Sequence, residues 1–380
     1  MITFLGEDKL KSIDIKKTAK ILYIFLLFFV LVIPISKIDE SDRSIIENRM
    51  LAKFPQNIDK NFGQGFERWI ADRYRFRNII SSTYLKCDRI VSGRISNSSA
   101  FEGKNKWLFY KDENSVQNFL DNNLFSIEEL EVIKDNLENR QIFLNKLGIK
   151  YYLLICPDKN RAYGDFYPNY IQKIGTGGGR GEQVFNYLKD HSQVNVVYPL
   201  QQILTERKHN ILYFKNDTHW NTLGAFLGYE QLISLCSKDF KLTNKLNVSD
   251  MELSYKDITD GDLQSMLQLT YEYYTGEKNP VFNKRLGYKF IYKENKGRAG
   301  VYTINKDNAI NVFMFRDSYA TSMIPYLSET FGNVRYIWTQ NFVGNIESIR
   351  AEKPQIVISE LVERSLHVLA CPDPIIKEDI

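Results

Sequence analysis

The sequence predicts an α/β fold built on a largely parallel β-sheet that helices cover on both faces. Between residues 126 and 360, short apolar runs that suit buried strands alternate with longer segments of helical periodicity. Strands that alternate with helices in this way form parallel sheets, because each return connection has room for a helix. Ligands of such sheets bind at the carboxyl ends of the strands, so we expect the functional site there.

The individual elements follow from local patterns. Buried strands are predicted at Tyr151–Cys156, Val194–Tyr198, Ile211–Phe214, Asn311–Phe315, Val334–Trp338 and Ile356–Ser359. Helical patterns occupy Ile127–Leu147, Leu223–Cys236, Ala320–Phe331 and Phe342–Glu352. Ser126 and Glu129 have the spacing of a capping box, which predicts that the first of these helices begins after Ser126.

Two stretches interrupt this alternation. The glycine-rich segment Gly175–Gly181 lacks the ending of a phosphate-binding P-loop, so we expect a surface loop. Residues 241–308 are rich in Lys, Tyr and Asn and contain turn signals, with a hairpin expected around Gly287–Ile304. We interpret them as a β-rich insertion that either shapes a substrate groove or only decorates the domain.

The N-terminal part predicts an extracytoplasmic protein on a membrane anchor. Residues 21–36 contain no charge, and with residues 18–20 they reach the length of a marginal membrane span. Lysines precede this run, so the positive-inside rule places residues 1–17 in the cytoplasm. A cleaved signal peptide and a buried core helix are the alternatives. We therefore predict a signal-anchor at 18–36, an N-terminal arm at 37–100 and a catalytic domain at 101–380.

Composition excludes several classes of function. Lys plus Arg number 50 and Asp plus Glu number 46, so the net charge of +4 is too small to indicate nucleic-acid binding. The four cysteines form no Cys-x-x-Cys motif, which argues against a zinc site. We expect neither a metal nor an organic cofactor.

A candidate base lies in Asp217-Thr218-His219. In an extended segment, residues i and i+2 point the same way, so the Asp217 carboxylate would orient the His219 imidazole. That pair is the orienting and proton-accepting half of a hydrolase triad. The alternative is a histidine with a purely structural role at a sheet edge.

A candidate nucleophile lies at Ser318, where the apolar strand Asn311–Phe315 has ended and a helix is about to begin. A serine on such a turn is exposed at the top of the sheet, near backbone N–H groups that can stabilise an oxyanion. The alternative is that Ser318 only caps the helix. Because Asp217 and His219 also follow a predicted strand, we expect the three side chains to meet at one rim of the sheet.

These motifs resemble the alginate O-acetyltransferase (AlgX/AlgJ-type) and DHHW families, SGNH-hydrolase-like proteins of the bacterial envelope. The matching pieces are Asp217-Thr218-His219-Trp220 with Asn221, Gly224 and Ala225; Asp317-Ser318-Tyr319; Asn48-Arg49-x-Leu51; Trp69-x-x-Asp72-x-x-x-x-Arg77; Lys106-Trp107-Leu108-Phe109; Gly261-Asp262-Leu263; and Glu360-x-x-Glu363-Arg364. The resemblance spans roughly residues 45–365. It implies an SGNH-hydrolase-like (flavodoxin-like) fold and acyl-serine chemistry with Ser318, His219 and Asp217 as the triad, in an order permuted relative to ordinary SGNH hydrolases.

The sequence departs from this family pattern in two respects. Arg316 stands where a glycine usually precedes Asp-Ser, and no residue is an evident side-chain donor for an oxyanion. Arg316, Lys159 and Asn160 are the candidates, although Lys159 and Asn160 also suit an ordinary turn.

From these features we expect a membrane-anchored O-acetyltransferase that modifies a cell-surface polysaccharide through an acyl-serine. The resemblance implies an acetyl donor supplied by a membrane-bound O-acyltransferase. Two alternatives remain: a carbohydrate esterase or deacetylase with the same triad, and a non-catalytic polysaccharide-binding assembly factor.

Overall fold

The computed structural model describes residues 20–25, 43–44, 49–74, 77–173, 177–295 and 300–373. The chain forms two compact units, which divide between Arg94 and Ile95. Most of the predicted membrane span at 18–36 lies outside the described residues, and residues 20–25 are helical. None of the helices in the described ranges is both long and apolar enough to cross a membrane.

The first unit contains two helices and a short strand pair. Its elements are β1 (Arg43–Ser44), β2 (Arg49–Met50), α2 (Phe62–Arg73) and α3 (Arg77–Ser92). The Phe54 ring meets the rings of Phe62, Phe66 and Trp69 edge-on, with centroid distances of 5.0–6.4 Å. The apolar face of α2 therefore packs against the chain that precedes it, as the helical spacing of its aromatic residues suggests.

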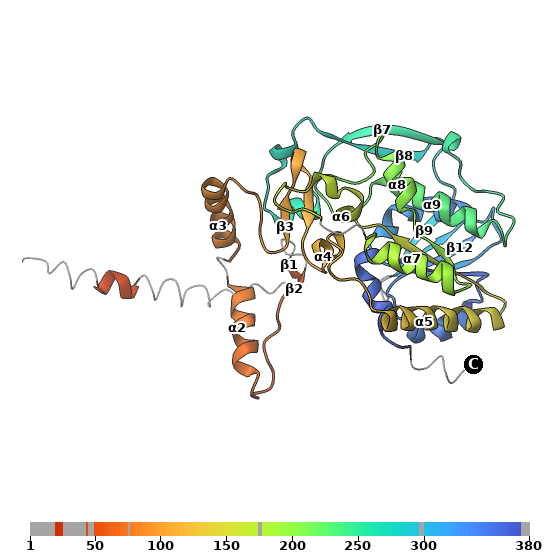
Figure 1. The fold of residues 1–380 in the computed structure, drawn as a ribbon, viewed down its shortest axis with the longest axis horizontal. Coiled ribbons are helices and arrows are strands. Elements are labelled where there is room, and N and C mark those ends of the chain that lie inside the picture. Colours follow the sequence, from red (N-terminus) through yellow and green to blue (C-terminus); the bar gives the residue numbers. More distant parts are fainter. Residues whose placement is uncertain are drawn as a thin grey trace, which may run out of the picture. The chain divides into compact units, whose positions relative to one another are not determined.

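The second unit is organised around a mixed β-sheet (Figure 1). Within the described residues the sheet has seven strands in the order β6-β5-β13-β11-β12-β10-β9. Neighbours from β6 to β12 pair in parallel, whereas β10 and β9 add an antiparallel edge. The strands are β5 (Lys150–Cys156), β6 (Asn195–Val197), β9 (Ile291–Asn295), β10 (Gly300–Ile304), β11 (Val312–Arg316), β12 (Asn333–Trp338) and β13 (Ile356–Val362). This confirms the predicted α/β fold with a largely parallel sheet.

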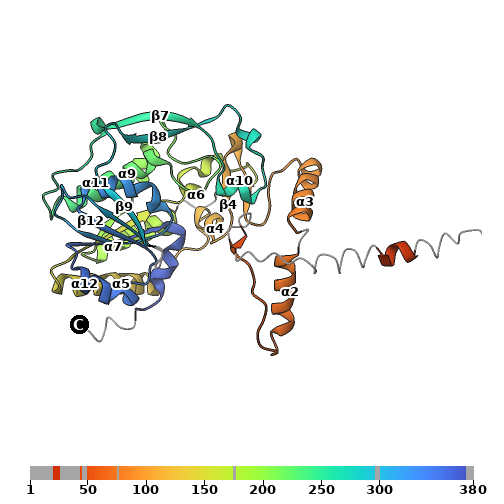
Figure 2. The same ribbon diagram turned by 180° about the vertical axis from the view of Figure 1, so that it is seen from behind.

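Helices cover both faces of this sheet, and each face has its own apolar core. Along β5, Tyr152 and Leu154 pack into one core, while the alternating Tyr151 and Leu153 pack into the other. Figure 2 shows α9 and α11 on the opposite side of the strands from α5 and α12. The α-helices of this unit, including those that do not pack on the sheet, are α4 (Ser115–Phe119), α5 (Ile127–Lys146), α6 (Lys159–Ala162), α7 (Gly179–His191), α8 (Leu200–Glu206), α9 (Thr222–Cys236), α10 (Asp262–Met266), α11 (Ile324–Thr330) and α12 (Ile346–Glu352).

Three sequence-based expectations need correction. Residues 211–214 form no strand, and Tyr213 makes one isolated bridge to Trp220. The apolar run is buried in the core beside α9 and does not pair with a strand of the sheet. The predicted helix Ala320–Phe331 is a 3-10 turn, η6 (Tyr319–Met323), followed by α11, which has a proline in its first turn. The glycine-rich segment is only partly a loop, since α7 begins at Gly179.

The predicted insertion is partly integrated into the domain. The expected hairpin is present as β9 and β10, and it joins the central sheet through β12. The preceding strands β7 (Met251–Asp257) and β8 (Lys278–Lys284) form a separate antiparallel pair, and α10 lies between them in the chain. A third pair, β3 (Ala100–Glu102) with β4 (Leu108–Tyr110), opens the unit.

The capping box of α5 offers a test of local stability. The Ser126 hydroxyl accepts from the Glu129 backbone N–H at 3.2 Å, and the Glu129 carboxylate accepts from the Ser126 N–H at 2.8 Å. Ser126→Ala should lower the free energy of unfolding by about 1 kcal/mol, measured by urea denaturation, because it leaves a helix N–H without a partner. Ser126→Thr should retain most of the wild-type stability. Equal stability of the wild type, Ser126→Ala and Ser126→Thr would contradict a role for this cap.

Candidate active site

Ser318 lies directly after β11, at the carboxyl edge of the sheet. Its backbone has helical angles (φ −68°, ψ −26°) and leads into η6, and its side chain makes no capping hydrogen bond. Asp317 holds the turn instead: its carboxylate accepts from the Tyr319 N–H at 2.8 Å and from the Val362 N–H at 2.7 Å. The Ser318 hydroxyl is thus left for another partner.

That partner is His219. The Ser318 Oγ lies 2.7 Å from His219 Nε2, although 99 residues separate the two in the chain. On its other side, His219 Nδ1 lies 2.6 Å from Asp217 Oδ1. With the Nδ1 proton held by the carboxylate, the Nε2 lone pair faces the serine hydroxyl. The structure therefore brings Ser318, His219 and Asp217 together in the order that a triad requires.

The local reason for the Asp217–His219 contact differs from the one expected. Residues 215–219 form turns and bends rather than an extended strand. Asp217 Oδ1 accepts from the backbone N–H of His219 at 3.0 Å as well as from the ring, so the carboxylate folds back over its own turn. A local side-chain to backbone bond, not strand alternation, orients this pair.

Two reciprocal hydrogen bonds join the histidine loop to the serine turn. The Tyr319 hydroxyl donates to the Thr218 carbonyl at 2.7 Å, and the Trp220 indole N–H donates to the Tyr319 carbonyl at 2.9 Å. Tyr319 and Trp220 are fully buried. The residues that flank Ser318 and His219 therefore fix the distance between them.

Charge and burial act in opposite directions on the pair. Burial disfavours the Asp217 carboxylate, but the His219 hydrogen bond and charge outweigh it, so the pKa of Asp217 lies below its ordinary value. Burial likewise disfavours the imidazolium, but Asp217 outweighs it and the pKa of His219 is raised. A base with a raised pKa accepts the serine proton more readily.

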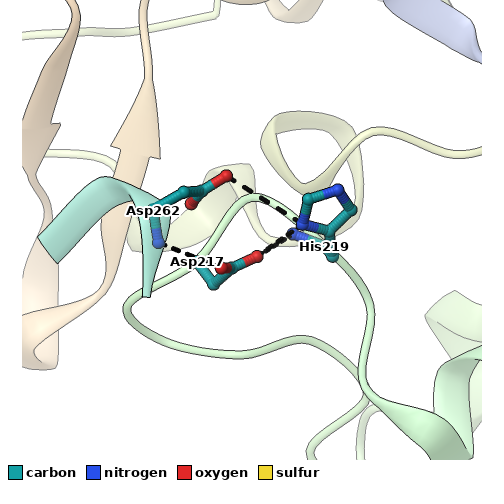
Figure 3. A group of neighbouring side chains, drawn as sticks. All are labelled: Asp217, His219 and Asp262. Atoms are coloured by element: carbon teal, nitrogen blue, oxygen red, sulfur yellow. Dashed lines mark hydrogen bonds and ion pairs between the residues drawn. The ribbon is translucent and has the colours of Figure 1, made fainter. Parts of the chain in front are cut away.

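A second carboxylate, Asp262, supports the loop from α10 (Figure 3). It accepts from the Thr218 N–H at 2.8 Å and from the Thr218 hydroxyl at 2.5 Å. Its own N–H donates to Asp217 Oδ2 at 3.0 Å, as Figure 3 shows. Its Oδ2 lies 3.9 Å from His219 Nδ1. Burial, followed by the charge of Asp217, raises the pKa of Asp262. Sequence reasoning assigned no role to Asp262; its only signal was the short motif Gly261-Asp262-Leu263.

Gly261 allows this segment to pack directly on the histidine loop. A Cβ at position 261 would lie 2.3 Å from the carbonyl oxygen of Asn216. The same Asn216 carbonyl accepts from the Gln264 N–H at 3.0 Å, and the Asn216 side chain donates to Gln264 Oε1 at 2.7 Å. The insertion is therefore a structural support of the site rather than decoration.

Asp217, His219 and Asp262 also form a group of possible metal ligands, with atoms within 4.8 Å of one another. A cation there would have to displace the Nδ1 proton that Asp217 already accepts. The hydrogen bonds of His219 to Asp217 and Ser318 account for both of its ring nitrogens, so the arrangement favours proton transfer over metal binding.

The three oxyanion candidates are bound to other groups. Buried Lys159 donates to the carbonyls of Lys215 and Asp217 at 2.9 and 2.8 Å, and burial lowers its pKa to about 7. Asn160 donates to the Tyr110 carbonyl, and Arg316 donates to the Asp317 carbonyl and the Thr321 hydroxyl. These bonds suit positioning of the surrounding loops, and the oxyanion role of all three stays a prediction.

The backbone N–H of Ser318 is a further candidate, of the kind that the sequence predicts at this turn. It has no hydrogen-bond acceptor among the described residues, whereas the neighbouring N–H groups of Asp317 and Tyr319 are bound to carboxylates. A nucleophile's own N–H is positioned to meet an oxyanion that forms on the attacked carbonyl.

The fold and this arrangement define an SGNH hydrolase-like α/β domain with a serine, a histidine and a carboxylate in hydrogen-bond contact. Residues 100–285 match the family model of the SGNH hydrolase-like domain of the acetyltransferase AlgX, which confirms the family resemblance. The match includes Asp217, His219 and Asp262 and ends before Ser318.

Solved structures of low sequence identity are similar to this chain. PatB1 of Bacillus cereus superposes with a TM-score of 0.50 at 16% identity, over 71% of this chain and 97% of that one. The O-acetyltransferase domain of Pseudomonas putida AlgJ gives 0.46 at 15% identity, over 73% and 94%. A DHHW family protein from Eubacterium siraeum gives 0.47 at 12% identity, over 62% and 85%. No curated protein matches the sequence.

Asp262→Asn tests how the second carboxylate acts on His219. The imidazole must be neutral to accept the Ser318 proton, so reactivity falls as the pH drops through the pKa of His219. Removing a negative charge at 3.9 Å should lower that pKa and move the fall to lower pH by about one unit. The measurement is the pH dependence of Ser318 labelling by phenylmethanesulfonyl fluoride, which requires no sugar.

The exposed neighbour Asp260 provides the matched control, and Asp260→Asn should leave the pH profile unchanged. A carboxyl group whose pKa is raised on folding destabilises the folded state when ionised, so replacing Asp262 with a neutral amide should not unfold the protein. An unaltered profile in Asp262→Asn would mean that Asp262 has no electrostatic effect on the base.

Proposed function

We propose that the protein is an extracytoplasmic O-acetyltransferase that modifies a cell-surface polysaccharide through an acyl-serine intermediate. The observation that carries the proposal is the continuous hydrogen-bonded line from Ser318 Oγ to His219 Nε2, at 2.7 Å, and from Nδ1 to Asp217, at 2.6 Å. The AlgX-type domain match supports an acetyltransferase rather than another serine enzyme.

In the first half-reaction, Ser318 Oγ attacks the carbonyl carbon of the donor's acetyl group and its proton passes to His219 Nε2. Asp217 stabilises the imidazolium that forms. The bond between the acetyl carbon and the donor's leaving atom then breaks, and His219 returns the proton to that atom. The product is an ester of Ser318.

In the second half-reaction, a sugar hydroxyl gives its proton to His219 Nε2 and its oxygen bonds to the acetyl carbon. The bond to Ser318 Oγ breaks, and the proton returns to this oxygen. In both halves, negative charge develops on the acetyl oxygen, where the Ser318 N–H can donate a hydrogen bond. All proton transfers use the chain's own side chains.

Water in place of the sugar hydroxyl would make the same site an esterase or deacetylase. A non-catalytic assembly factor is the other alternative. A serine and a histidine held beyond hydrogen-bond reach would favour it, whereas Ser318 Oγ and His219 Nε2 lie 2.7 Å apart. The proposal includes a membrane anchor at residues 18–36 and a membrane-bound O-acyltransferase that supplies the acetyl group.

Ser318→Ala should abolish acetylation of the polymer in cells, because the acyl-enzyme cannot form. Ser322→Ala, a change to a half-buried serine in η6, serves as the matched control and should retain acetylation. The measurement is ester-linked acetate released from purified polymer by mild base, with protein levels checked by immunoblot. Normal acetylation by the Ser318→Ala protein would disprove the transferase.

Activation of the nucleophile can be measured without the natural donor. Phenylmethanesulfonyl fluoride should modify Ser318, as located by peptide mass spectrometry, and His219→Ala should slow the modification about a hundredfold or more. Acetate release from 4-nitrophenyl acetate, with and without an oligosaccharide acceptor, then separates hydrolysis from transfer. Labelling that is independent of His219 would mean that the observed hydrogen bond does not activate the serine.

A further inference from the structure

An exposed tryptophan ends the strand next to the nucleophile strand. Trp338 is the last residue of β12 and pairs in parallel register with Arg316, the last residue of β11. Its side chain is 53% exposed, whereas Trp107 and Trp220 are buried. An indole left in solvent forgoes the free energy of burial, so its position at the carboxyl edge suggests a ligand-binding role.

Arg316 connects this tryptophan to the serine turn. Its guanidinium carbon lies 4.5 Å from the centre of the Trp338 ring, while its Nη1 donates to the Asp317 carbonyl at 3.1 Å and to the Thr321 hydroxyl at 2.9 Å. The residue is 6% exposed, and its Nε has no hydrogen-bond partner in the described part of the chain. The guanidinium thus lies over one face of the indole, and its Nε is a buried donor without a partner.

Gln340 supplies an unsatisfied acceptor on the same edge. Its side-chain amide donates to the Glu360 carbonyl on β13 at 2.6 Å. Because β11 lies between β12 and β13, the Gln340 side chain must pass over the end of β11, where the Asp317–Ser318 turn begins. Its Oε1 is buried and lacks a partner among the described residues. Two unpaired polar groups, one donor and one acceptor, thus accompany the exposed ring.

We propose that Trp338, Arg316 and Gln340 form an acceptor subsite, in which a pyranose ring of the polysaccharide stacks on the indole. The apolar C–H face of a sugar fits an aromatic ring, and its hydroxyls fit one donor and one acceptor. The subsite rests on the proposed acyl transfer, since it would hold the sugar whose hydroxyl attacks the acyl-serine. Arg316 thereby has a function that explains why a glycine is absent there.

A cavity at the antiparallel edge of the sheet, beside β9 and β10, does not serve this purpose. It has a volume of about 550 Å³ and includes Val312 and Asn333, the first residues of β11 and β12. Its lining also includes Ile337 on β12 and Glu352 of α12, a helix that packs on the sheet face opposite to η6, which follows Ser318.

The test separates acceptor binding from serine chemistry. In the full-length protein, Trp338→Ala should raise the KM for an oligosaccharide acceptor about tenfold and leave hydrolysis of 4-nitrophenyl acetate unchanged. Trp338→Phe should lie between the two, because it keeps an aromatic face. Tyr255→Ala, which removes another exposed aromatic side chain from β7, is the control and should have no effect. The acceptor probes are cellotetraose, chitotetraose and a tetramannuronate.

Binding is measured independently of turnover by intrinsic fluorescence. A binding sugar should change the emission of the wild-type protein and shield it from acrylamide quenching, and Trp338→Ala should abolish both effects. An acceptor KM or a fluorescence change that is unaltered by Trp338→Ala would overturn the subsite, as would the absence of binding by all three sugars. Absence of 4-nitrophenyl acetate hydrolysis by the wild-type protein would instead overturn the proposed function.

Discussion

The hydrogen bond between Ser318 and His219 is the interaction on which the proposed acyl transfer depends. A serine hydroxyl is a poor nucleophile, and it becomes reactive only where a base can take its proton within about 3 Å. The two residues lie on separate loops, so their distance has to be set by the rest of the fold. Tyr319 and Trp220 do this through bonds between the loops that are fully buried and therefore shielded from competing water.

The loop that carries His219 is stabilised from several sides by polar groups. Lys159 donates to two of its carbonyls, and Asp262, which belongs to the insertion, accepts from the Thr218 N–H and hydroxyl. Arg364 bridges Asp158 and the Tyr319 hydroxyl, with its guanidinium over the Tyr319 ring. His219 thus faces the negative charges of Asp217 and Asp262 and the positive charge of Arg364, and the carboxylates dominate. An imidazole in such a field keeps one tautomer and one orientation, which a proton shuttle requires.

Much of the fold was predictable because its signals are local. The run Tyr151–Cys156 forms a central strand, and the Ser126–Glu129 box begins α5 as expected. The segment 211–214 was misinterpreted because an apolar run reports burial and cannot report whether a neighbouring strand exists. Asp217 and His219 were paired by an argument from strand geometry, whereas the contact arises from a turn. The support by Asp262 could not be predicted, since it depends on an insertion packing 45 residues away in sequence against the loop.

The sequence by itself determined most of the order of strands and helices, the residue types available for the proposed acyl-serine chemistry and the family resemblance, because these are properties of short segments. The tertiary structure alone decided which of these residues meet. It placed Ser318 against His219 across 99 residues, turned Lys159 and Arg316 toward their carbonyl acceptors, and left Trp338 exposed beside the nucleophile strand. Such distances are set by the packing of the whole sheet and its insertion, which no local pattern encodes.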